Sequence, residues 1–189
     1  MANVNAPYGL KAVRHSTGGN VQTNDYPINP SYTTAIFSGD VVHGDADGTI
    51  TLSASGTADN IGVFCGCTYI NAQGLQKYSQ YWTGEAGATN IMAHVYDDPN
   101  IIFQAQANAT GLVAADLNNL TDLDTYAAGS TRTGKSACMV SGTVGTTGKT
   151  FRVLRLINDG VNVAGAYTNV EVVFIEHALR GVVSGVGGV

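Results

Sequence analysis

Short stretches rich in β-branched and apolar residues recur along this chain, and each is soon closed by glycine, asparagine, aspartate or proline. Residues 49–53 alternate apolar and polar side chains, which is typical of a half-buried strand. Residues 61–70 form the strongest strand candidate, and Asn71-Ala72-Gln73-Gly74 ends it as a turn. This spacing predicts an all-β fold, either a β-sandwich or a jelly-roll-like barrel, rather than βαβ units.

The same pattern places further strands along most of the chain. They are expected over residues 10–15, 22–28, 32–37, 41–42, 78–82, 90–96, 101–107, 151–157 and 170–175. Only residues 112–120 have helical spacing, so at most one short helix is expected. Residues 129–150 are rich in Gly, Thr and Ser and predict a long hairpin or a pair of loops.

The two ends of the chain differ from its middle. Residues 1–9 lack periodicity and read as an extended arm, which can span roughly 30 Å when stretched. Residues 181–189 form an uncharged Gly/Val tail that either frays or docks on a neighbouring subunit. Residues 10–180 are then the β-rich domain. The candidate partner-binding residues are Val4, Pro7, Tyr8 and Leu10 in the arm and Val183, Val186 and Val189 in the tail.

Charge is scarce, and this argues against several classes of protein. Charged residues make up 12% of the chain and the net charge is −5, with Lys and Arg scattered singly. Nucleic acid is therefore not an expected partner, because binding it usually requires a basic stripe. No apolar run approaches a membrane span of about 20 residues, and the first residues do not resemble a signal peptide, so we expect synthesis in a cytoplasm and reduced cysteines. A neutral surface suits a protein packed beside copies of itself.

Residues 129–136 match the phosphate-binding pattern G-x-x-x-x-G-K-[ST] at every defined position, with Lys135 and Ser136 last. In a nucleoside triphosphatase this loop lies between a buried strand and a helix. Here residues 121–128 are not a hydrophobic strand, and residues 137–145 are a poor helix with two glycines. A surface turn is the better interpretation.

Other chemical motifs also favour structural roles. Asp45-Ala46-Asp47-Gly48 begins like a calcium loop, but the twelfth position is Gly56, so a hairpin turn is expected. Residues 97–100 predict another turn, and Cys65-x-Cys67 has poor spacing for zinc. The four histidines lie in unrelated strands, and we expect no catalytic residue, metal or cofactor. Tyr78, Tyr81 and Trp82 would suit either a sugar platform or an aromatic core or interface.

The order of motifs carries a family resemblance. The chain opens Met1-Ala2-Asn3-x-Asn5-Ala6-Pro7-x-Gly9-Leu10 and continues with Ser38-Gly39-Asp40, Ile61-Gly62-Val63-Phe64, Tyr81-Trp82, Val95-Tyr96-Asp97-Asp98-Pro99-Asn100, Phe103, and Thr168, Val170, Val172, Ile175 and His177. This order resembles the head-decoration, or capsid cement, proteins of tailed phages from aquatic bacteria. The chain departs from that pattern at Glu176-His177-Ala178-Leu179, where an Asn-His-Gln stretch would stand before the tail.

The resemblance implies a structural virion protein without enzymatic activity. It implies a homotrimer on the outer surface of the capsid, near local threefold positions, that clamps the major capsid protein against internal DNA pressure. The alternative is a receptor- or glycan-binding module of a phage fibre, or another minor virion structural protein. A glycan-binding module would need Tyr81 and Trp82 on the surface.

Overall fold

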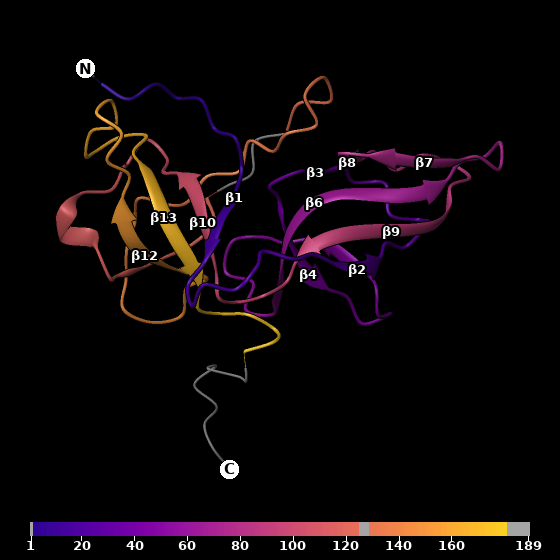
Figure 1. Ribbon diagram of the computed structural model, residues 1–189, viewed down its shortest axis with the longest axis horizontal. Helices are drawn as coiled ribbons and strands as arrows, with labels where there is room; N and C mark the ends of the chain where they lie inside the picture. Colours follow the sequence, from indigo (N-terminus) through magenta and orange to yellow (C-terminus); the bar gives the residue numbers. More distant parts are fainter. Residues whose placement is uncertain (1, 125–128, 181–189) are drawn as a thin grey trace, which may run out of the picture.

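The computed structural model describes residues 2–124 and 129–180 (Figure 1). Its strands form antiparallel sheets, which confirms the predicted all-β fold. Among the described residues the strands do not close into a barrel, so the sandwich alternative agrees with the structure better than the jelly-roll-like barrel does. No helix in these two ranges is long and apolar enough to cross a membrane.

Two sheets and a strand pair make up the fold. Sheet A has the order β1 (Lys11–His15), β10 (Ile101–Gln106), β13 (Asn169–Phe174), β12 (Phe151–Leu156) and β11 (Leu120–Thr121). Sheet B has the order β2 (Asn24–Pro27), β9 (Thr89–Tyr96), β6 (Asn60–Ile70), β4 (Val41–Gly44) and β5 (Ile50–Leu52), with β7 (Gln76–Ser79) paired to β6. The remaining pair is β3 (Ile36–Phe37) and β8 (Tyr81–Trp82).

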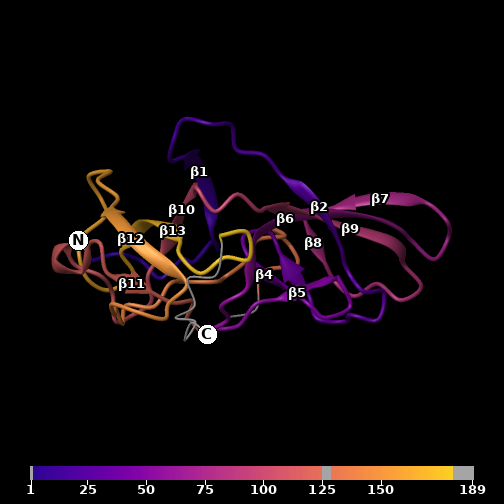
Figure 2. The same ribbon diagram turned by 90° about the horizontal axis from the view of Figure 1, so that it is seen from below.

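The two sheets are centred on separate hydrophobic clusters, although Val41 and Val63 of sheet B belong to the cluster under sheet A. The pair β3–β8 covers sheet B, where Trp82 and Phe64 are almost fully buried. Irregular segments that carry Leu112, Leu123 and Val140 cover sheet A instead. The sheets therefore form two lobes that lie side by side along the long axis of the molecule (Figures 1 and 2).

The strand order shows how the chain passes between the lobes. It leaves sheet A after β1, builds all of sheet B from β2 to β9, and returns to sheet A at β10. The return passes through the turn at residues 97–100, whose position between two strong strands agrees with the sequence. This topology places β1 at the edge of sheet A that faces the sheet B lobe (Figure 1).

The helical spacing of residues 112–120 produces only one 3₁₀ turn, η1 (Ala114–Asp116). Asn118 has a φ of 68°, which interrupts a regular helix, and Leu120 already belongs to β11. The apolar residues of this stretch therefore do not line one helical face. Leu112 instead reaches the core next to an isolated β-bridge with Gly165.

Candidate partner-binding surfaces

The N-terminal arm lies against its own chain. The Asn3 side chain donates to the carbonyl oxygens of Val163 and Ala166, at 2.6 and 2.9 Å, and accepts from the Val163 amide at 2.9 Å. The side chain of buried Gln106 accepts from the Ala6 amide and donates to the Val4 carbonyl, each at 3.0 Å. These contacts fix the backbone of the arm while the side chains of Val4, Asn5 and Ala6 stay exposed.

The structure separates the candidate residues of the arm. Val4 is 75% exposed, whereas Pro7 and Tyr8 are half-buried. Leu10 is only 3% exposed and packs in the cluster under sheet A, so it is a core residue of its own chain and not an exposed contact. Gly9 explains this change, because its φ of +76° and its close approach to Gly39 take the chain from the surface into the core. Val183, Val186 and Val189 lie outside the described residues.

A rigid loop beside the arm exposes two more valines. Val161 is 64% exposed and Val163 is 44% exposed. The Asp159 carboxylate accepts the amides of Val161 and Asn162, and these hydrogen bonds hold the pKa of Asp159 below its usual value. The Asn162 side chain donates to two carbonyl oxygens and accepts from the Asn169 amide. We call Val4, Val161 and Val163 the arm-end patch; its backbone is held in place before any partner binds.

Asn3 is expected to hold the arm in place while contributing little to global stability. Asn3→Ala removes three hydrogen bonds, so the amide of Val163, which loses its acceptor, and the amide of Ala6 in the arm should lose protection in hydrogen exchange. The free energy of unfolding should change by about 1 kcal/mol or less. Asn5→Ala is the matched control, because Asn5 is exposed and has no hydrogen bond among the described residues. Equal protection in the two variants would contradict this role.

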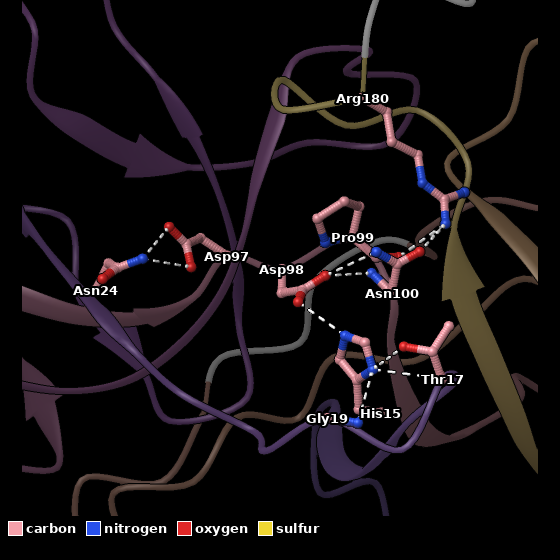
Figure 3. Close-up of polar contacts among 9 residues, drawn as sticks. All are labelled: His15, Thr17, Gly19, Asn24, Asp97, Asp98, Pro99, Asn100 and Arg180. Atoms are coloured by element: carbon pink, nitrogen blue, oxygen red, sulfur yellow. Dashed lines mark hydrogen bonds and ion pairs between the residues drawn. The ribbon is translucent and has the colours of Figure 1, made fainter.

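The turn between β9 and β10 connects the two lobes (Figure 3). The Asp97 carboxylate accepts two hydrogen bonds from the Asn24 side chain, at 2.8 and 3.0 Å, and one from the Tyr26 hydroxyl, at 2.7 Å. Asp97 thereby holds β2 of sheet B. Asp98 instead contacts His15 of β1, with 2.8 Å between the carboxylate and Nε2. Adjacent carboxylates therefore hold one strand of each sheet.

Hydrogen bonds define the state of the His15–Asp98 pair. The His15 Nδ1 atom accepts the amides of Thr17 and Gly19, so Nε2 carries the proton that faces Asp98 (Figure 3). Burial alone would raise the pKa of Asp98, but hydrogen bonds from the Asn100 amide and His15 outweigh burial and lower it. Asp98 is thus an ionised carboxylate that accepts hydrogen bonds from the Asn100 amide in the turn and from His15 in β1.

Arg180 attaches the last described residue to the same turn. Its guanidinium donates to the Pro99 carbonyl and to Asn100 Oδ1, each at 3.1 Å (Figure 3). A third hydrogen bond, of 2.8 Å, reaches the Phe174 carbonyl at the end of β13. The turn, the end of β13 and Arg180 therefore form one connected cluster.

A groove of about 740 Å³ lies where the two lobes meet. Its lining comes from the arm, β1, β6, β7, β9, β10 and the segments around residues 38 and 135: Tyr8, Leu10, Lys11, Ala12, Ser38, Gly39, Phe64, Cys65, Tyr78, Tyr96, Gln104 and Lys135. Tyr78 can lie across β6 because Gly66 has no side chain; a Cβ atom there would stand 2.8 Å from the Tyr78 hydroxyl. We call this feature the inter-lobe groove.

The groove holds two lysines without ion-pair partners. Lys77 and Lys149 lie near carboxylates, with nitrogen–oxygen distances of 3.6 Å to Glu85 and 3.7 Å to Asp122. Lys11 and Lys135 have no ion pair within residues 2–124 and 129–180. None of the described groove residues carries a carboxylate. The groove is therefore a cationic surface on a chain of net negative charge.

The Tyr8 hydroxyl and the Cys65 thiol, both in the groove, are neutral near pH 7. Burial raises the pKa of Tyr8 to about 12, and burial also raises the pKa of the Cys65 thiol. Cys65 and Cys67 are free cysteines. A thiol with a raised pKa is a poor nucleophile, so Cys65 contributes shape and polarity rather than reactivity.

The segment with the phosphate-binding pattern forms a tight turn. Ser130 pairs with Lys135 across it, and the residues after Ser136 are irregular rather than helical. Ser136 donates to the buried carboxylate of Asp40, so its hydroxyl faces the interior. This geometry lacks the strand and helix on which phosphate binding by this motif depends. The turn instead places Lys135 at the groove, beside Ser38.

The remaining motifs lie in structural positions. Trp82 is 1% exposed and donates from Nε1 to the Tyr32 carbonyl at 2.9 Å, while Tyr81 stacks on Phe37. The surface sugar platform considered for Tyr81 and Trp82 is therefore absent. In the described part of the chain, no three His, Cys, Asp or Glu side chains gather as metal ligands would.

The sequence predicted Val4 of the arm-end patch as a contact residue, but it did not identify Val161, Val163 or the groove. The groove combines Lys11, Tyr78 and Lys135, which are far apart in the sequence. The sequence signal that could have found the rest of the arm-end patch is the apolar pair Val161 and Val163 in a polar loop. No family model, no curated protein and no solved structure matches this chain.

Proposed function

We propose that this protein decorates the outer surface of a tailed-phage capsid and cements neighbouring coat subunits against internal DNA pressure. The order of motifs from the arm to His177, described above, supports this function. The arm-end patch is the structural observation that carries it, because exposed valines on a fixed backbone are typical of a protein–protein contact.

The chemistry of the arm-end patch suits contact with other subunits of the shell. Burying one valine contributes roughly 1.5 kcal/mol, so a single patch binds weakly. A homotrimer would present three patches, and several weak contacts made together hold far more tightly than one. Backbone hydrogen bonds already order the loop, which lowers the entropy that binding costs. The proposed partners are the major capsid protein and two further copies of this chain.

A single charge in the arm-end patch is expected to weaken attachment to shells. Val163→Asp would place an unpaired carboxylate in the contact, so the shell-bound fraction should fall about tenfold or more. Val113→Asp is the matched control, because Val113 is 43% exposed and Val163 is 44% exposed. The measurement is the ratio of this protein to coat protein on denaturing gels of shells purified after mixing.

The same mixtures test the proposal as a whole. Wild-type protein should sediment as a trimer and should saturate shells at a copy number comparable to that of the coat protein. A monomer that ignores assembled shells, or that attaches only at a few sites per particle, would refute the cement function.

A further inference from the structure

We propose that the inter-lobe groove binds an extended, acidic segment of a partner protein, which adds as a strand to the free edge of β1. The inference rests on the proposed function in one respect: the segment would come from a coat subunit. The contact is separate from the arm-end patch.

The edge of β1 provides the backbone groups for such a contact. Within the described residues β1 pairs with β10 alone, so its second edge has no strand partner. Backbone hydrogen bonds fix the chain on either side of β1, from Leu10 to Gly39 and from Ser16 to Asn100. Leu10, Lys11 and Ala12 line the groove, and Figure 1 shows β1 on the side of sheet A nearest sheet B. A rigid, unpaired edge inside a groove is a template for strand addition.

The charges of the groove select an acidic segment. Lys11 on β1 and Lys135 on the turn at residues 130–135 are exposed and lack ion pairs among the described residues. Because the described lining has no carboxylate, a basic segment would find no ion-pair partner there, whereas an acidic segment would meet two ammonium groups. Tyr78, 63% exposed, adds an aromatic surface for the side chains between the acids.

A polypeptide fits these features better than a nucleic acid does. Two lysines neutralise only two phosphates, which is far fewer than the contacts on which tight nucleic-acid binding depends. A β-strand edge offers alternating amides and carbonyls, which match another backbone but not a sugar–phosphate chain. We therefore assign the groove to a peptide.

Fluorescence anisotropy with the purified full chain tests this assignment. The probe is a labelled ten-residue peptide of alternating Thr and Glu. The comparison ligands are the same peptide N-methylated at alternate amides, a Thr–Lys peptide and a ten-nucleotide oligo-dT. We expect the acidic peptide to bind, and both the N-methylated peptide and the Thr–Lys peptide to bind at least about tenfold more weakly. Equal binding of the N-methylated peptide, or tighter binding of oligo-dT, would overturn strand addition.

Matched double variants test the role of charge. K11Q/K135Q should weaken binding of the acidic peptide at least about tenfold. K77Q/K149Q makes the same change in net charge and should leave binding of this peptide unchanged. Unchanged melting temperatures would show that both variants fold. Equal binding by the two variants would overturn the role of the groove lysines.

Shell attachment separates this inference from the proposed function. Failure of the wild-type protein to bind the acidic peptide, together with normal attachment to coat shells, would overturn the groove assignment alone. Failure to attach to shells, together with peptide binding that depends on Lys11 and Lys135, would refute the cement function and leave the groove as a peptide site.

Discussion

Replacing Trp82 with alanine is expected to lower the free energy of unfolding by about 4 kcal/mol. Trp82 is among the largest fully buried side chains, and its ring packs edge-on against Tyr69 with 5.5 Å between centroids. The variant would leave a cavity between β8 and sheet B and would remove the donor to the Tyr32 carbonyl. Urea denaturation at neutral pH measures the loss.

Tyr78→Ala is the control for Trp82→Ala, because it removes an exposed aromatic side chain instead of a buried one. Tyr78 is 63% exposed, so its removal should change stability by about 0.5 kcal/mol or less. The two aromatic residues lie close together in the sequence, yet the structure assigns one to the core and the other to the groove. A small effect of Trp82→Ala would contradict its burial and would return the surface sugar platform to consideration.

Two buried groups are expected to give opposite pH dependences of stability, which largely cancel between pH 4 and 6. Burial raises the pKa of Asp40 to about 6 from 3.8, although hydrogen bonds from Ser136 and the Phe37 amide oppose this. Burial lowers the pKa of His177 to about 4 from 6.5, and Arg180 lowers it further, against smaller opposing contributions that include nearby carboxylates. Each unit of pKa difference corresponds to about 1.4 kcal/mol, so each group contributes about 3 kcal/mol.

The signs follow from which state binds more protons. Asp40 is protonated more readily in the folded state, so its contribution is present below pH 3.8 and is lost as the pH rises through 6. His177 is protonated more readily in the unfolded state, so its contribution is present above pH 6.5 and is lost as the pH falls through 4.

Single variants should therefore reveal each slope. Relative to the wild type, Asp40→Asn should become less stable by about 3 kcal/mol on going from pH 6.5 to 4, because only the His177 slope remains. His177→Asn, which keeps an acceptor for the Leu179 amide, should instead lose stability relative to the wild type as the pH rises from 4 to 6. Urea titrations across this range measure the differences. Parallel curves for all three proteins would show that neither group is perturbed.

Local patterns in the sequence predict most strands but not their arrangement. Residues 61–70 combine apolar and β-branched side chains and end in a turn, and they lie in β6. The period of apolar residues does not indicate that the chain builds two separate apolar clusters. Val63 and Phe64 are neighbours in β6, yet they lie in different clusters. Leu10 shows the same limit: it follows an irregular arm, and only the left-handed Gly9 takes it into the core.

The candidate sites were less predictable because they depend on contacts between distant residues. The exposure of Val4 agrees with an irregular arm, but nothing local indicates that Asn3 would fix it beside Val163. The residues around Lys135 predicted a surface turn, but not that this turn places Lys135 at a groove formed by segments far apart in the chain. Spacing rules describe neighbours in sequence, whereas a groove between lobes is defined by topology.

On the pressurised shell proposed above, the cluster around the β9–β10 turn would have a mechanical consequence. A pull on the chain beyond Arg180 would reach the Pro99 carbonyl, the Asn100 side chain and the end of β13 together, so these three contacts would share the load. Since Asp97 and Asp98 tie the same turn to β2 and β1, tension would spread into both lobes at once. Without the Arg180 guanidinium, the same pull would reach β13 but not the turn, and the load would no longer be distributed between them.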